Sequence, residues 1–88
     1  MKIIKFIALW CADCIVMRPL WREISEKFSQ LEIVDIDFDD NEAEAKKFVV
    51  TKIPLTIFFD SDDKEITRHQ GMHNKADLIK LIEENLDK

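Results

Sequence analysis

Trp10-Cys11-Ala12-Asp13-Cys14 lies where the residue pattern changes from that of a strand to that of a helix. Before it, the segment from Ile3 to Leu9 is apolar at nearly every position, which predicts a strand buried on both faces. From Ala12 on, apolar residues recur instead at helical spacing. The buried stripe of this predicted helix consists of Met17, Leu20, Trp21, Ile24 and Phe28. The two cysteines therefore open a helix that directly follows a central strand.

Two cysteines at this place have a specific chemical use. The first turn of a helix carries unpaired amide groups and the positive end of the helix dipole, and both stabilise a thiolate at Cys11. Cys14 lies one turn further on, so the two sulfur atoms can join with little backbone movement. We therefore predict a dithiol in which Cys11 is the exposed, attacking thiol and Cys14 the shielded, resolving thiol.

The rest of the chain predicts two more helices and three more strands. A strand from Leu31 to Phe38 precedes a short helix that ends at about Val50 and is capped from residues 39–41. The apolar run of residues 55–59 and the polar run of residues 64–69 are separated by a turn and predict a hairpin whose second strand is an exposed edge. Asn74 can cap a last helix. Its apolar stripe is Leu78, Ile79, Leu81, Ile82 and Leu86. The fold class is α/β, in the order βαβα-ββα, with one mixed four-stranded sheet flanked by helices.

Composition limits the class of protein. Eighty-eight residues predict a single domain spanning residues 1–88, and 47% apolar residues with one glycine and two prolines exclude a disordered chain. A net charge of −5 disfavours nucleic acid as a partner, and no apolar run approaches the length of a membrane span. Because no secretion signal is recognisable, we expect a cytoplasmic protein, in which two cysteines this close would not serve as a permanent staple.

These motifs together resemble the thioredoxin-fold family, specifically its small thioredoxin and glutaredoxin-like members. The matching features are Trp10-Cys11-x-x-Cys14, Pro19 five residues after the second cysteine, the Ile53-Pro54 pair and Gly71. The resemblance implies the strand order 2-1-3-4, with the third strand antiparallel to the first, and a cis Ile53–Pro54 bond beside the cysteines. It also implies an apolar docking platform for an extended peptide, made of Trp10, Ile53, Pro54, Gly71 and Met72. Because the chain begins at the strand leading to the cysteines, we expect it to lack the amino-terminal strand and helix of full-length thioredoxins.

The sequence also departs from the family pattern. Ala12-Asp13 replaces the usual Gly-Pro between the cysteines, and the negative charge of Asp13 opposes thiolate formation. Lys5 stands where thioredoxins commonly have a buried aspartate, and Asp35 falls about where they place a lysine. A buried ammonium group needs a partner, so we predict that Lys5 and Asp35 form an ion pair beneath the active site that tunes the ionisation of the cysteines.

Two other interpretations of the cysteines involve a metal. Cys11, Cys14, His69 and His73 form two pairs, but the long gap between the pairs is unlike that of a zinc finger. The histidines are better explained as surface residues around Gly71. An iron–sulfur cluster shared by two chains, as in some glutaredoxins, is a second alternative. We predict neither a metal nor a cofactor, only the redox-active Cys11–Cys14 disulfide.

The predicted function is that of a thiol–disulfide oxidoreductase that acts on protein disulfides, as a reductant, through a reversible Cys11–Cys14 dithiol. Its partners would be disulfide-containing proteins and an electron donor, either a reductase or a low-molecular-weight thiol, and we expect it to be a monomer. The alternative is a non-catalytic binding or adaptor module built on the same fold. Loss of both sulfur atoms separates the two functions, because only the adaptor would survive it.

Overall fold

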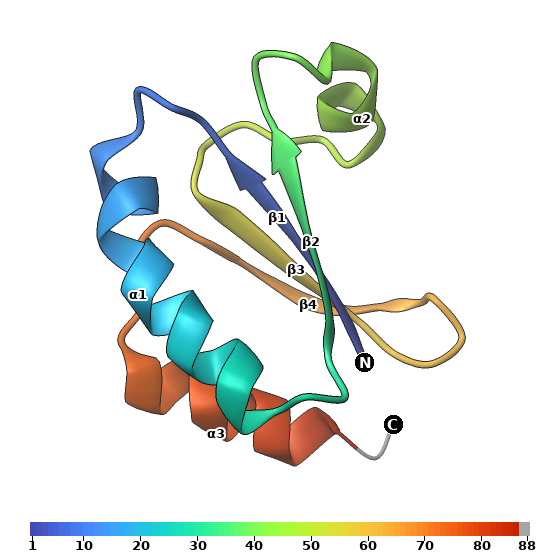
Figure 1. Ribbon diagram of the computed structural model, residues 1–88. Helices are drawn as coiled ribbons and strands as arrows, with labels where there is room; N and C mark the ends of the chain where they lie inside the picture. Colours follow the sequence, from blue (N-terminus) through green and yellow to red (C-terminus); the bar gives the residue numbers. More distant parts are fainter. Residues whose placement is uncertain (87–88) are drawn as a thin grey trace.

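The computed structural model describes residues 1–86 and has the predicted order of elements (Figure 1). The elements are β1 (Lys2–Ile7), α1 (Ala12–Lys27), β2 (Glu32–Asp37), α2 (Glu42–Lys47), β3 (Leu55–Phe59), β4 (Glu65–Gln70) and α3 (Lys75–Asn85). The first strand ends two residues before the predicted Leu9, because Leu9 and Trp10 form an exposed turn into α1. Pro19 lies inside α1, as predicted. No helix of residues 1–86 is long and apolar enough to cross a membrane.

The sheet has the order β2-β1-β3-β4. Strand β1 pairs with β2 in parallel and with β3 in antiparallel orientation, and β3 and β4 form the antiparallel hairpin. This arrangement confirms the predicted mixed sheet and places β1 at its centre. The turn to the cysteines therefore follows the carboxyl end of an inner strand and lies at one end of the sheet (Figure 1).

Helices cover both faces of the sheet (Figure 1). On one face, α1 and α3 enclose a core with side chains of β1 and β3; its fully or nearly fully buried members are Ile3, Met17, Trp21, Ile24, Phe28, Phe58, Leu78 and Ile82. On the other face, α2 contributes Ala45 to a second core with Ile4, Phe6, Leu55, Ile57 and Phe59. The apolar character of β1 on both faces follows from this three-layer arrangement.

Two details of the fold differ from the sequence-based expectations. Strand β4 is half-buried over most of its length rather than exposed, because Ile66 packs on the core and the Arg68 guanidinium bonds to Glu65 and to the carbonyl of Phe48. Asn41 does not cap α2 with its side chain. Instead, the Asp37 carboxylate accepts hydrogen bonds from the amides of residues 39 and 40.

Two isoleucines of α1 test the core. Ile24 is fully buried and Ile15 is 48% exposed. We expect Ile24→Ala to lower the free energy of unfolding by about 2–5 kcal/mol, because it leaves a cavity between α1 and the sheet. Ile15→Ala, the matched control on the same helix, should change it by less than about 0.5 kcal/mol. Urea unfolding followed by circular dichroism measures both, and equal effects of the two variants would contradict the burial described.

Candidate active site

The two cysteines lie at the junction of β1 and α1. Cys11 is the N-cap residue of α1, in an extended conformation (φ −87°, ψ 106°), and its sulfur accepts a hydrogen bond of 3.2 Å from the amide of Cys14. Both residues are free thiols, so the structure is that of the dithiol. The capping position brings the Cys11 sulfur to the amide-rich end of the helix, where a negative charge is stabilised.

The prediction that Cys11 is exposed is wrong. Its side chain turns back onto the helix to act as the cap, and Ala8 and Ile53 pack against the cysteine pair. As a result the exposed fractions are almost equal, 6% for Cys11 and 7% for Cys14. Exposure therefore does not distinguish the attacking thiol from the resolving thiol.

Electrostatics sets Cys14 apart. Burial is the largest effect that raises the pKa of the Cys14 thiol to about 11, and the hydrogen bond with Cys11 and the charges of Cys11 and Asp13 raise it further. A hydrogen bond with the backbone of Ala8 opposes this shift only in part. Cys14 is therefore a protonated thiol near neutral pH, and a poor nucleophile until it loses its proton.

The Ile53–Pro54 bond lies beside the cysteines and is cis, as predicted. Ile53 packs against the cysteine cluster, and the carbonyl of Pro54 accepts a hydrogen bond of 2.8 Å from the amide of Gly71. Gly71 has a φ of 83°, a conformation that favours glycine. This bond brings the loop after β4 next to Pro54, and Met72, 49% exposed, follows directly in that loop.

Trp10 precedes Cys11 and is 65% exposed. Its indole Nε1 donates a hydrogen bond of 2.6 Å to the carboxylate of Asp39, which follows β2. The sequence predicts no contact for Asp39, because this residue lies in an acidic run that is typical of a solvated turn with capping residues. Only the parallel pairing of β1 and β2, which ends both strands at one edge of the sheet, indicates that the two residues come together.

Lys5 and Asp35 are direct neighbours across β1 and β2 and form the predicted ion pair, with 3.1 Å between Nζ and Oδ1. Lys5 is only 9% exposed, and its ammonium group lies 4.9 Å from the ring centre of Trp21. Asp35 keeps about half of its side chain in solvent. Both residues line a cavity of about 40 Å³, together with Cys14, Pro54 and Thr56. The ion pair therefore lies beneath the active site.

The two histidines do not join the cysteines. Their rings contact each other, with centroids 4.4 Å apart, at the end of β4 and in the loop that follows it. Within residues 1–86 there is no group of three or more histidine, cysteine or acidic side chains that could hold a metal ion. Both residues are partly exposed on either side of Gly71, which agrees with the expectation of surface residues there.

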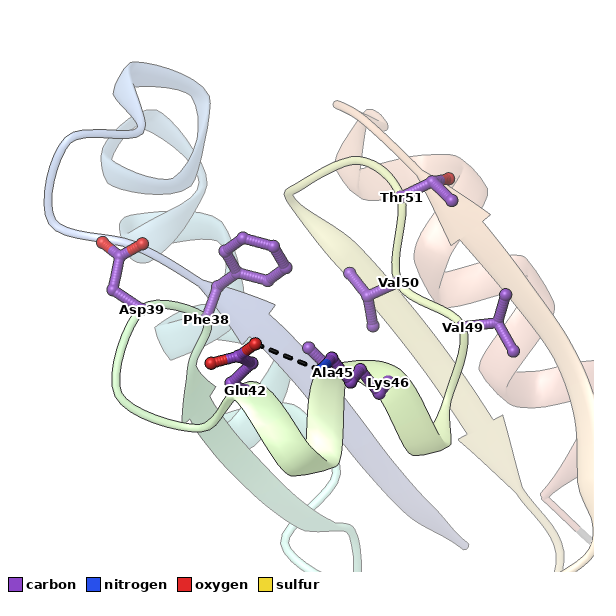
Figure 2. Close-up of a pocket in the computed structure, with 8 residues that line it drawn as sticks. All are labelled: Phe38, Asp39, Glu42, Ala45, Lys46, Val49, Val50 and Thr51. Atoms are coloured by element: carbon purple, nitrogen blue, oxygen red, sulfur yellow. Dashed lines mark ion pairs between the residues drawn. The ribbon is translucent and has the colours of Figure 1, made fainter.

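A larger groove lies between the end of β2 and α2 (Figure 2), and no cysteine lines it. It has a volume of about 600 Å³ and is lined by Phe38, Asp39, Glu42, Ala45, Lys46, Val49, Val50 and Thr51. Its charged side chains include Glu42 and Lys46, which pair with each other at 3.2 Å. The groove contains no sulfur atom and no group suited to redox chemistry, so the cysteines remain the functional centre.

A dithiol at the start of a helix, beside a cis-proline and after an inner strand of a 2-1-3-4 sheet, defines a thiol–disulfide exchange protein. The comparisons agree. The family model described as Thioredoxin matches residues 1–84. Thioredoxin of Chlamydia trachomatis is 34% identical over 80 residues (91% of this chain, 78% of the relative), and that of Mycolicibacterium smegmatis is 36% identical over 87 residues (96% and 77%).

Among solved structures, oxidised mitochondrial thioredoxin 3 from Saccharomyces cerevisiae is similar with a TM-score of 0.84 and 28% identity, over 94% of this chain and 76% of that one. The chain therefore belongs to the thioredoxin family. It is a thiol–disulfide oxidoreductase, and its Cys11–Cys14 dithiol serves as the reductant.

The shifted ionisation of Cys14 gives a direct prediction. When the reduced protein reacts with a small excess of iodoacetamide at pH 8, Cys11 should be alkylated first, because Cys14 with a pKa of about 11 is almost entirely protonated. Peptide mass spectrometry over a time course identifies the labelled residue. The urea-unfolded protein is the control, since both thiols should then react at similar rates. Earlier labelling of Cys14 in the folded protein would overturn the assignment.

Proposed function

We propose that Cys11 is the nucleophile and Cys14 the resolving thiol in the reduction of protein disulfides. The Cys11 thiolate attacks one sulfur of the substrate disulfide, forms a mixed disulfide and releases the other substrate sulfur as a thiolate. Cys14 then loses its proton and attacks the Cys11 sulfur, which closes the Cys11–Cys14 disulfide and releases the second substrate thiol. Two electrons and two protons pass to the substrate. The observation that carries this order is the position of Cys11 as the helix cap, with the protonated Cys14 behind it.

The docking surface lies around Cys11. Trp10, which precedes Cys11, and Met72, which follows Gly71, are exposed apolar side chains. Ile53 packs against the cysteines, and the Gly71–Pro54 hydrogen bond holds the start of the loop that carries Met72. Exposed apolar surface in a chain this small is costly unless a partner covers it. An extended peptide that pairs with backbone groups beside Pro54 would make the specificity broad, because main-chain hydrogen bonds carry little side-chain information.

The Lys5–Asp35 pair would serve the second step. A nearby cation favours a thiolate, so the Lys5 ammonium assists the ionisation of Cys14 across the small cavity that they share. A cavity of about 40 Å³, with Lys5, Asp35 and Thr56 among its lining residues, is large enough for a water molecule. The half-exposed Asp35 carboxylate can accept the Cys14 proton through such a water and pass it to solvent.

The thioredoxin family and the composition support the cofactor, location and oligomeric state that we propose. The reaction needs no group other than the dithiol, and the electron donor is a reductase or a low-molecular-weight thiol. The protein would work as a single-domain monomer in the cytoplasm, where disulfides are kept reduced.

Trapping tests the order of the two cysteines. Cys14→Ser should accumulate mixed disulfides with protein substrates, because the resolving thiol is missing, whereas Cys11→Ser should form none. Non-reducing gel electrophoresis after incubation with a disulfide-bonded protein measures both. Equal trapping by the two variants would refute the proposed roles. Full binding of partner proteins by a variant that lacks both sulfur atoms would favour the adaptor function.

A double-mutant cycle tests the ion pair. Asp35→Asn should lower the free energy of unfolding by about 1–3 kcal/mol, because it leaves the Lys5 ammonium buried without a carboxylate. The double variant Lys5→Met with Asp35→Asn should regain most of that loss, since no buried charge remains.

The same variants test the proposed role in catalysis. Lys5→Met should raise the pKa of Cys14 further and prolong the lifetime of the mixed disulfide, measured by rapid quench. An unchanged lifetime would leave Lys5 with a structural role only.

A further inference from the structure

We propose that His69 and His73 are positioning residues, whose ring contact holds the docking loop of residues 71–74 in place while the His69 imidazole is neutral and releases it in mild acid. Protein disulfides should then bind less well below neutral pH, although the cysteines themselves are unchanged. This inference rests on the proposed function, because it concerns the docking surface around Cys11.

The docking loop is fixed at both ends by hydrogen bonds. At its start, the amide of Gly71 donates to the carbonyl of Pro54. At its end, Asn74 caps α3 by accepting a hydrogen bond of 2.8 Å from the amide of Asp77. Between these points Met72 is half exposed and His73 is partly buried. His73 is thus the inward-facing side chain that determines how the loop presents Met72.

The His73 ring packs against the His69 ring. The two rings meet edge to face with centroids 4.4 Å apart, and the His69 ring also contacts Phe58 at 6.0 Å. On the sheet, His69 pairs with Thr56, and Thr56 pairs with Lys5. Residues paired across strands lie on the same face, so His69 belongs to the polar row that includes the Lys5–Asp35 pair. The loop is therefore anchored to the same face of the sheet as the active site.

This contact favours the neutral form of the His69 ring. Burial is the largest effect that lowers the pKa of His69, the neighbouring His73 lowers it further, and Asp77 on α3 raises it. Of the other charged groups near this face, Lys75 on α3 is paired with Glu23 of α1 at 2.7 Å, and Lys5 on β1 is two strands away. Nε2 of His73 is buried beside this contact and has no hydrogen-bond partner among the described residues.

The lowered pKa of His69 determines the sign of the pH dependence. The folded state binds a proton at His69 less readily than the unfolded chain, whose histidine has an ordinary pKa of 6.5. The contribution of the pair to the stability of the loop is therefore complete above pH 6.5 and is lost as the pH falls through the lowered pKa of the folded state. The loop, rather than the whole fold, should respond first, because it has few other contacts.

The experiment compares two substrates of the reduced protein between pH 7.5 and 5.5. One is an extended, uncharged peptide that carries a fluorogenic disulfide and needs the docking loop; the other is 5,5′-dithiobis(2-nitrobenzoate), which is too small to use it. The ratio of the two second-order rate constants cancels the ionisation of Cys11. We expect this ratio to fall by at least about fivefold in acid, as coupled binding equilibria typically give. The fall should appear in KM rather than kcat.

Substitutions at His69 and Asp77 test whether the fall in the ratio comes from protonation of His69. His69→Phe keeps a ring against Phe58 but cannot take up a proton, and the ratio should become independent of pH. His69→Gln is a second neutral variant in case the first does not fold. Asp77→Asn keeps both rings and removes the opposing carboxylate, so the fall should move to lower pH. Because the chain has only two histidines, proton NMR assigns each titration from the single variants.

A pH-independent ratio in the unmodified protein, or the same fall in His69→Phe, would overturn the proposal. Cys11→Ser separates this failure from a failure of the proposed function. If that variant still reduces 5,5′-dithiobis(2-nitrobenzoate), the assignment of Cys11 is wrong whatever the histidines do.

Discussion

The central strand β1 has a neighbour on each edge and a core on each face, and the rest of the structure depends on this burial. Its four inner residues are all buried. Apolar side chains satisfy that constraint on both faces, and the strand then delivers the chain at its carboxyl end to the helix that Cys11 caps. The active site is thus placed by a deeply buried strand, which keeps the cysteines fixed relative to Pro54.

Lys5 of β1 does not fit an apolar strand, and the opposite charge of Asp35 compensates its own. Lys5 is buried but paired with Asp35 and covered by the ring of Trp21. Relative to the family pattern the charges of the pair are exchanged between the two strands, with the cation on the central strand next to Cys14 and the carboxylate nearer to solvent. Burial is nevertheless the largest effect on the Cys14 thiol and raises its pKa to about 11. The ion pair and Cys14 thus line the same small cavity, while Cys11 lies at the amide-rich end of the helix.

Much of this could be predicted from the sequence, and what could not has physical reasons. The order of elements and the Lys5–Asp35 contact follow from hydrophobic patterns and from the parallel register of two adjacent strands. The burial of Cys11 was missed because a helix N-cap can turn its own side chain inward, which composition does not reveal. The Trp10–Asp39 bond and the His69–His73 contact join segments that are distant in sequence or separated by an irregular loop, where no periodicity exists.

The central claim is that Cys11 and Cys14 form one reversible two-electron couple. The most direct test is to equilibrate the protein in buffers with increasing ratios of reduced to oxidised dithiothreitol and to follow the intact mass after acid quenching. The account predicts two species that differ by two hydrogen atoms, with a single transition that fits a two-electron equilibrium and disappears in Cys11→Ser and in Cys14→Ser. A protein that stays reduced throughout, or that forms only disulfide-linked dimers, would contradict the account.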